Sequence, residues 1–346
     1  MTRSDSRSYK RARPFSTAVI QIGIVGCGVI GNRLAAAIDD HDRYELAAAC
    51  DLDADRAASL AADHGTDRTA TTTDHASLVE TDGLDAVYVG VPPLAHREVV
   101  ADALAADKHV ICEKPIAADA ETGRELVALA EESDRVTAVN LPFRYTPGFV
   151  RLREAVADGA IGDPRRVELR FRFPQWPREW QDVAWLESRE QGGPLREVGT
   201  HFLFGVQELF GPIERVSADV GYSGPEAYED DVVGTFRADG VRGTIDLLCD
   251  HEGDEENSVT VVGDEASLSL TEWYRLVRNR GREGEETLVD ERGDTVSALL
   301  TEFAGAVDGD DGDLVSFAEA TRVQEVLDAI HASDGDRVHL GAGAER

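Results

Sequence analysis

Lysine is almost absent from this sequence, which contains only Lys10, Lys108 and Lys114. The 346 residues include 67 acidic and 35 basic ones, and the net charge is −32. A surface of this sign repels nucleic acid and anionic membranes, so we predict neither as a partner. It stays soluble where salt shortens the Debye length to about 3 Å. The pattern favours a halophile's protein, from a salt-loving cytoplasm, over an ordinary acidic protein.

Cysteine pairs and long apolar runs are also lacking. Cys27, Cys50, Cys112 and Cys249 form no Cys-x-x-Cys motif and are expected to be buried free thiols. No apolar run reaches the ~18 residues of a membrane span. The sequence has no Gly-x-x-x-x-Gly-Lys loop, no serine nucleophile elbow and no metal-ligand spacing. We therefore predict no P-loop phosphate site, no serine nucleophile and no metal.

The first 18 residues are polar and basic, and they lead into an apolar strand instead of a signal-peptide core. We therefore predict a disordered basic tail over residues 1–18 and a cytoplasmic protein. An over-extended start site is the alternative, and a tail that contacts RNA is less favoured.

The length suggests about two domains of ~150 residues. Over residues 19–145, apolar strand-like runs alternate with helix-like segments. The expected strands are 19–25, 45–50, 86–91, 109–112 and 136–139, and the expected helices are 31–38, 56–64, 95–106 and 120–132. This alternation predicts an α/β Rossmann domain with a doubly wound parallel sheet that is covered on both faces.

Residues 146–346 follow a different pattern, in which apolar and polar residues alternate with period two after a helix over 149–157. Strands are expected over 167–173, 215–222, 232–238, 242–249, 258–263 and 266–273, and helices over 295–307 and 316–332. We predict an α+β substrate-binding and oligomerisation domain with a large, mainly antiparallel open sheet. One face of this sheet is expected to be packed and the other to be exposed to solvent or to a partner. The exposed face favours a homodimer or homotetramer assembled through it.

A glycine turn, Gly26-Cys27-Gly28-Val29-Ile30-Gly31, follows the first expected strand and opens a helix. In this motif the first glycine permits a tight turn, the second lets the backbone approach a pyrophosphate, and the third lets helix and strand pack closely. The helix N-terminus adds free N–H groups. We predict a dinucleotide site that includes Gly26, Gly28, Val29, Ile30 and Gly31.

Asp51 ends the second expected strand, 20 residues after Gly31. Its carboxylate would accept hydrogen bonds from the adenosine ribose, and Asp53 beside it would repel a 2′-phosphate. NAD is therefore favoured as the cofactor, although the nearby Arg56 leaves NADP open.

Two more strand ends point to the same cleft, because the carboxyl ends of parallel strands line the ligand crevice. The third strand ends in Val91-Pro92-Pro93-Leu94-Ala95-His96 and the fourth in Cys112-Glu113-Lys114-Pro115. We predict cofactor contacts from Val91, Pro92, Leu94, His96, Glu113 and Lys114. A surface lysine beside a proline turn is the alternative for Lys114.

At Glu113-Lys114-Pro115 the chain resembles the Gfo/Idh/MocA oxidoreductases, the glucose-fructose oxidoreductase and inositol dehydrogenase family. The resemblance runs from about Ile20 to Leu340, and it includes the glycine turn, the Arg144-Tyr145-Thr146-Pro147 segment and the motif over 192–201. It implies that Lys114 and His201 are the catalytic pair. Glu197 stands where the family has an aspartate, so the carboxylate's arm is longer. Phe204 replaces a second aspartate, which marks a distinct subgroup.

The residues by themselves support the same pair. Pro194 suits a first helical turn, and Glu197 and His201 then lie on one helix face. Hydride transfer from a carbinol carbon needs a base for the hydroxyl proton, a donor for the developing alkoxide and a carboxylate that orients the base or binds a neighbouring hydroxyl. His201, Lys114 and Glu197 suit these tasks in that order. A satisfied core histidine is the alternative for His201.

Aromatic and basic residues surround this motif. We expect Trp176, Trp180, Tyr145 and Arg196 to contact the substrate, because aromatic faces suit the C–H surfaces of sugars. The tryptophans fit a core or an oligomer contact equally well, and the nearby arginines leave an acidic sugar open. Arg144 is expected to contact the cofactor.

Together these features predict an NAD(P)-dependent dehydrogenase or reductase that acts on the CH–OH groups of a sugar, cyclitol or related polyol. A non-catalytic dinucleotide-binding regulator of the same fold is the alternative, because the resembled family contains a repressor branch. The presence of both Lys114 and His201 argues against it. A scaffold that binds no dinucleotide is the third reading.

Overall fold

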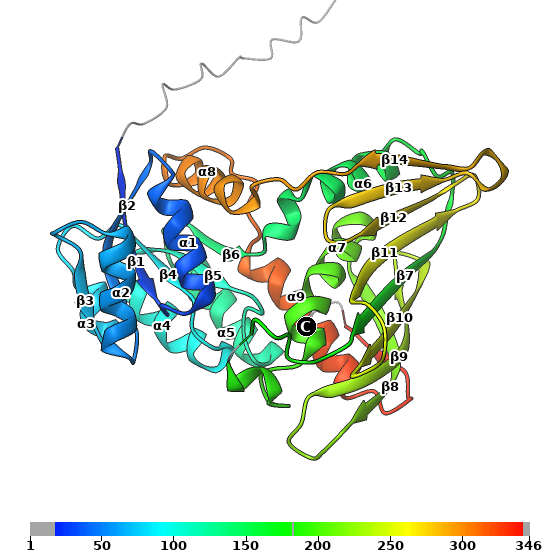
Figure 1. Cartoon of the computed structure of the whole chain (residues 1–346), viewed down its shortest axis with the longest axis horizontal. Coiled ribbons are helices and arrows are strands. Elements are labelled where there is room, and N and C mark those ends of the chain that lie inside the picture. The colour runs from blue at the N-terminus through cyan, green and yellow to red at the C-terminus, as the bar shows by residue number, and fades with distance from the viewer. Residues whose placement is uncertain (1–17, 182, 342–346) are drawn as a thin grey trace, which may run out of the picture.

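The computed structural model describes residues 18–181 and 183–341, which form two sheets side by side with helices between and around them (Figure 1). The tail expected over residues 1–18 lies, except for Ala18, outside the described residues.

Six parallel strands form the first sheet, in the order β3-β2-β1-β4-β5-β6. They are β1 (Ile20–Val25), β2 (Tyr44–Cys50), β3 (Ala70–Thr72), β4 (Ala86–Val89), β5 (His109–Glu113) and β6 (Thr137–Asn140). The helices of this half are α1 (Val29–Asp39), α2 (Ala54–His64), α3 (His75–Val79), α4 (Pro93–Ala105) and α5 (Ala120–Glu131). The predicted Rossmann sheet is confirmed. Strand β3 and helix α3 were not predicted, because three and five residues are too short to show a period.

Helices cover both faces of the first sheet, and strand β1 shows how. Its isoleucines Ile20, Ile22 and Ile24 pack with buried residues of α1, α2 and a later helix, α8 (Thr295–Val307). Val25 belongs to the other core, with residues of α3, α4 and α5. Burial on both faces explains why these strands read as continuous apolar runs.

Nine strands form the second sheet, in the order β14-β13-β12-β11-β7-β10-β9-β8-β15. They are β7 (Pro164–Phe173), β8 (Ile213–Tyr222), β9 (Glu229–Ala238), β10 (Val241–Cys249), β11 (Glu256–Gly263), β12 (Ser267–Thr271), β13 (Arg275–Asn279), β14 (Glu285–Val289) and β15 (Val338–His339). Only the β7–β10 pair among these is parallel, so the predicted mainly antiparallel sheet is confirmed. Strands β13, β14 and β15 were not predicted, because all three are short and the first two are rich in charged residues.

One face of the second sheet is covered by α6 (Pro147–Ala157), α7 (Thr200–Phe210) and α9 (Phe317–His331) (Figure 1). From residue 232 to 238, strand β9 alternates between buried and more exposed residues, and Val233 on the uncovered side is 62% exposed. This is the face through which a homodimer or homotetramer was expected, and that assembly stays a prediction.

Two helices that follow β14 in the chain return toward the first sheet. Helix α8 completes a core of the Rossmann sheet, and α9 packs against both α5 and β8. The expected division after residue 145 stays a prediction, and these returns show that the C-terminal segment contributes to both halves.

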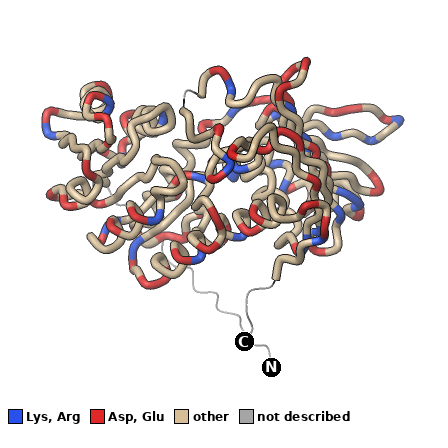
Figure 2. Tube along the Cα trace, turned by 90° about the horizontal axis from the view of Figure 1, so that it is seen from below, with Lys and Arg blue, Asp and Glu red and all other residues tan. Residues whose placement is uncertain are grey.

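Acidic residues are spread over both halves of the molecule (Figure 2). The four cysteines are buried and unpaired, as expected. Within residues 18–181 and 183–341, no helix has both the length and the hydrophobicity that crossing a membrane requires.

Candidate active site

A cavity of about 1080 Å³ opens at the carboxyl ends of the Rossmann strands and reaches the second half of the chain. Many residues singled out in the sequence line it: Gly26, Gly28, Val29, Ile30, Asp51, Val91, Pro92, Glu113, Lys114, Trp180, Glu197 and His201. The cofactor and catalytic candidates therefore share one cavity, although almost 90 residues separate Lys114 from His201 in the chain.

The glycine turn has a different use for each glycine. Gly26 has a φ of +101°, and a Cβ there would lie 2.3 Å from the carbonyl oxygen of Gly90. A Cβ on Gly31 would lie 2.0 Å from the carbonyl oxygen of Gly26. A Cβ on Gly28 would meet nothing within 4 Å. Gly26 and Gly31 are therefore needed for packing, whereas Gly28 keeps open space beside the start of α1.

Helix α1 begins at Val29 without a side-chain cap, so its first N–H groups remain available to a ligand. Such N–H groups and the positive end of the helix dipole suit a diphosphate. Exposed apolar side chains on the same wall, including Leu52 at 94% exposure and Val29 at 48%, suit planar rings. This part of the cavity fits a dinucleotide.

Asp51 holds the glycine turn from the end of β2. Its carboxylate accepts hydrogen bonds from the backbone N–H groups of Cys27 at 2.8 Å and Asp53 at 3.0 Å. Asp53 caps α2 by accepting from the N–H of Asp55. Arg56 lines the cavity, with its Nε 3.8 Å from a carboxylate oxygen of Asp53.

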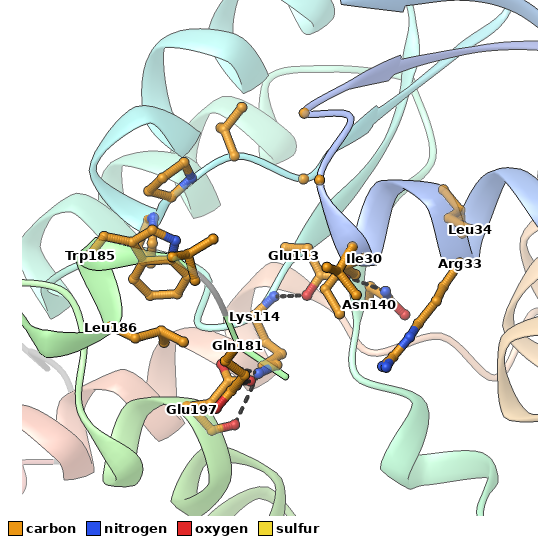
Figure 3. A pocket seen from close by; sticks show the side chains of 18 of the residues that line it. Ile30, Arg33, Leu34, Glu113, Lys114, Asn140, Gln181, Trp185, Leu186 and Glu197 are labelled. Carbon is orange, nitrogen blue, oxygen red and sulfur yellow. Dashed lines mark hydrogen bonds and ion pairs between the residues drawn. The ribbon is translucent and has the colours of Figure 1, made fainter. Parts of the chain in front are cut away.

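Lys114 and Glu197 join the two halves of the molecule (Figure 3). The Lys114 ammonium lies 2.6 Å from Glu197 Oε2 and donates to the backbone carbonyl of Glu197 at 2.9 Å. Gln181 donates to the other carboxylate oxygen of Glu197 at 3.2 Å. Lys114 follows the end of β5, and Glu197 lies in the π-helical turn Leu195–Gly199 that leads into α7. The ion pair therefore fixes the catalytic candidates against each other across the cavity.

Glu113 is buried beside Lys114. Its carboxyl accepts hydrogen bonds from the Tyr88 hydroxyl and the Asn140 side-chain amide, and also from the backbone N–H of Lys114 at 3.1 Å. Burial raises the pKa of this carboxyl, while Lys114 lowers it. Glu113 thus supports the end of β5 from within the protein as well as lining the cavity.

His201 is buried at the second position of α7, and its Nδ1 has no hydrogen-bond partner. Its ring packs edge-on against Trp273, with 5.2 Å between centroids. Burial, followed by the charges of Lys114 and Arg178, holds the pKa of His201 well below its usual 6.5. A neutral imidazole at the cavity wall can accept a proton.

Several predicted cofactor residues do not line the cavity. Arg144 instead pairs with Asp313 at 2.6 Å and lies within 3.6 Å of Glu208 and Glu319. His96 is fully buried, and its two ring nitrogens lie near the carbonyl oxygens of Val91 and Ile116. Leu94 is half exposed beside the cavity, and Gly31 is buried under the turn. These residues shape the surroundings of the site and are not part of its lining.

Three of the four predicted substrate residues also lie elsewhere. Trp176 belongs to the core, where its indole N–H donates to the Leu186 carbonyl. Tyr145 donates to the carbonyl of Asp313. Arg196 is buried and donates to the carbonyls of Arg189 and Gly192. Trp180 alone of the four reaches the cavity, where the Arg33 guanidinium lies 4.9 Å from its ring centroid.

The sequence analysis missed other lining residues. Asn140 ends strand β6 next to β5, so the rule that strand ends line the crevice would have identified it. Gln181 and Trp273 come from irregular segments whose path depends on tertiary packing, and no local pattern marks them.

Comparisons with known proteins agree with this geometry. Residues 20–141 match the "Oxidoreductase family, NAD-binding Rossmann fold", and residues 149–269 match the "GFO/IDH/MocA C-terminal domain". The chain belongs to the Gfo/Idh/MocA oxidoreductase family. The resemblance seen in the sequence is thereby confirmed.

Two relatives and one solved structure illustrate the family. A dTDP-3,4-didehydro-2,6-dideoxy-alpha-D-glucose 3-reductase of Streptomyces violaceoruber is 31% identical over 58% of this chain, and the match spans only 57% of that relative. A 1,5-anhydro-D-fructose reductase of Ensifer adhaerens is 28% identical over 83% of this chain and 88% of the relative. The crystal structure of GenD2 from gentamicin A biosynthesis, in complex with NAD, is 25% identical, with a TM-score of 0.80 over 96% of this chain and 99% of that one.

The N-terminal half is thus an NAD-binding Rossmann domain, and the predicted cofactor class is confirmed. The open space at Gly28, the uncapped start of α1 and the carboxylate of Asp51 are the features of this chain that fit the dinucleotide.

Two variants test the roles of Gly31 in packing and of Gly28 in leaving space for the cofactor. We expect Gly31→Ala to lower the melting temperature, because its Cβ meets the carbonyl of Gly26. Gly28→Ala should keep the melting temperature of the free protein but weaken NAD binding about tenfold or more, about 1.4 kcal/mol, because its methyl group enters the cofactor's space. Thermal melts and calorimetric titration with NAD measure both effects. Unchanged NAD affinity in Gly28→Ala would contradict the role given to the turn.

Proposed function

We propose that this protein is an NAD-dependent dehydrogenase or reductase that acts on a CH–OH group of a sugar, cyclitol or related polyol. One observation carries the proposal. The Lys114–Glu197 ion pair and the buried His201 lie on the wall of the same cavity as the glycine turn. The dinucleotide supplies or accepts the hydride when it is bound.

The three side chains have complementary tasks in this proposal. The neutral His201 accepts the hydroxyl proton as the alcohol is oxidised, and it returns the proton in the reverse direction. The Lys114 ammonium stabilises the developing alkoxide. Glu197 holds that ammonium at 2.6 Å and has a second oxygen for a neighbouring substrate hydroxyl, in competition with Gln181.

The cavity's lining supports a polyol as the substrate. Trp180, Trp185 and Trp273 offer aromatic faces that suit sugar C–H surfaces. Gln181 and Asn140 add groups that bond hydroxyls. The names of the two reductases described above, which refer to sugar derivatives, point to the same class.

A substrate screen tests the proposal directly. Purified protein is assayed with a panel of sugars, cyclitols and sugar acids, with NAD and NADP in parallel, at 0.1 M and at molar salt. We expect turnover with NAD, greater activity in molar salt because the net charge of −32 is then screened, and weaker use of NADP because of Asp51. NAD binding without turnover of any substrate would favour the regulator instead.

Substitution of the catalytic pair should abolish turnover without removing the cofactor. We expect Lys114→Met and His201→Gln each to lower kcat by about 100-fold or more, the range of lost acid–base or electrostatic assistance. NAD affinity should stay within about threefold of wild type. Lys108→Met is the matched control, because the Lys108 ammonium donates to the carbonyl of Leu84 and does not line the cavity. Near-normal turnover in either active-site variant would overturn the assignment.

The depressed pKa of His201 gives a pH prediction. The pKa lies well below 6.5, so the ring is already neutral at pH 6.5 and gains its proton only in more acidic solution. The kcat/KM for alcohol oxidation should therefore decrease only at pH values below 6.5, where His201 becomes protonated. Arg178→Gln should move this decrease to higher pH, because Arg178 contributes to the lowering. A decrease that begins at or above pH 7 in wild type would show that His201 is not the base.

A further inference from the structure

We propose that Glu229 is a positioning residue, which fixes the turn that holds Glu197 against Lys114 by accepting the backbone N–H of Leu195. The inference rests on the proposed function only in calling Lys114 and Glu197 catalytic. The structural link itself runs from the second sheet to the cavity wall and does not depend on a substrate.

The link begins with a buried carboxylate. Glu229 starts strand β9 and is 0% exposed. Its Oε1 accepts the N–H of Leu195 at 2.7 Å. Leu195 is the first residue of the π-helical turn, and that turn has no side-chain cap of its own. Glu229 therefore supplies, from another element, the acceptor that the start of this helix lacks.

The same turn sets both contacts of the Lys114 ammonium. Glu197 lies two residues after Leu195, and Lys114 bonds its carboxylate at 2.6 Å and its backbone carbonyl at 2.9 Å. A backbone carbonyl moves only with its own turn. A shift of the Leu195–Gly199 segment would therefore move both acceptors away from Lys114 together, and the side chain of Glu197 alone could not compensate.

The adjacent glycine shows how closely the chain is drawn to the carboxylate. Gly193 has a φ of +96°, and a Cβ there would lie 2.4 Å from Glu229 Oε2. Any other residue would have to displace either the turn or the Glu229 carboxyl, and both displacements separate Glu229 from the turn. The second glycine of Gly192-Gly193 is thus explained by contact with Glu229, since Gly193 does not line the cavity.

Burial of the Glu229 carboxyl costs free energy. Burial raises its pKa to about 7, and Oε2 has no hydrogen-bond partner. Among the residues that the structure describes, the ionisable groups facing it are Arg196 in the turn, Arg189 before it, His331 from α9 at 3.9 Å, and Tyr222 and Cys249 on the neighbouring strands. Replacing a poorly paired buried charge with an apolar residue is often neutral or stabilising. A role in holding the turn accounts for a hydrogen-bond acceptor here, whereas stability alone does not.

The scarcity of lysine supplies a test that needs no substrate. Acetic anhydride acetylates only uncharged amines, and the chain has three lysines that mass spectrometry can quantify separately. The contacts of the Lys114 nitrogen with the carboxylate and the backbone carbonyl of Glu197 must break before this nitrogen can react, so they slow its acetylation. Lys108, which bonds the carbonyl of Leu84, serves as the internal reference in every sample.

We would compare wild type with Glu229→Ala, Glu229→Gln and Asp231→Asn. Glu229→Ala should raise the acetylation rate of Lys114 relative to Lys108 about threefold or more, because the contacts of Lys114 with Glu197 are loosened. Glu229→Gln should stay near wild type, because its amide oxygen can still accept the N–H of Leu195. Asp231→Asn is the matched control, since Asp231 lies exposed on the same strand. Glu197→Gln removes the ion pair directly and sets the upper rate.

Circular dichroism and thermal melts show whether each variant is folded at the assay temperature. Should Glu229→Ala not fold, Glu229→Asp replaces it, because its shorter arm withdraws the carboxylate from Leu195 and should raise the rate of Lys114 part of the way. An unchanged Lys114 rate in folded Glu229→Ala or Glu229→Asp, or an equal rise in Glu229→Gln, would overturn the inference. The proposed function fails separately, if the substrate screen finds no turnover while the labelling pattern holds.

Discussion

The ion pair between Lys114 and Glu197 is the contact on which the arrangement of the site depends. Lys114 follows the end of β5 in the Rossmann sheet, and Glu197 lies in a π-helical turn anchored on the second sheet. With their atoms 2.6 Å apart, the two residues bring the cofactor-binding half and the α7 helix with His201 to one cavity. The partner of each charge is the other, so loss of either leaves the remaining one partly buried and unpaired.

The rest of the site follows from this constraint. Tyr88 and Asn140 donate hydrogen bonds to Glu113, which precedes Lys114 in the chain. Gln181 donates a hydrogen bond to Glu197. His201 carries no such partner at Nδ1, and burial beside Lys114 keeps it neutral. Electrostatic stabilisation and proton acceptance are thus divided between a paired cation and an uncharged ring. This division suits a reaction in which an alkoxide forms and a proton leaves.

Local signals in the sequence were sufficient for much of the first half. The glycine turn, Asp51 and the ends of β4 and β5 were found because each lies within a few residues of a strand whose apolar run is visible. The structure places Arg144 outside the cavity lining, and its three acidic neighbours come from α7, α9 and the segment before α9. For Trp176 the structure shows the core position, which the sequence left open beside a substrate contact, because a cluster of tryptophans does not show which ring faces the core.

The sequence by itself determined the fold class, the dinucleotide turn and the identity of Lys114, Glu197 and His201 as candidates, because these depend on short-range periodicity and on motifs. Only the tertiary structure decided which residues share the cavity, since Gln181 and Trp273 reach it from chain segments remote from the strand ends. It also brought Glu229 to the backbone N–H of Leu195, which lies 34 residues away in the chain. The low pKa of His201 was also decided there. A histidine's charge depends on desolvation and on neighbouring cations, and neither can be read from the residues beside it in the chain.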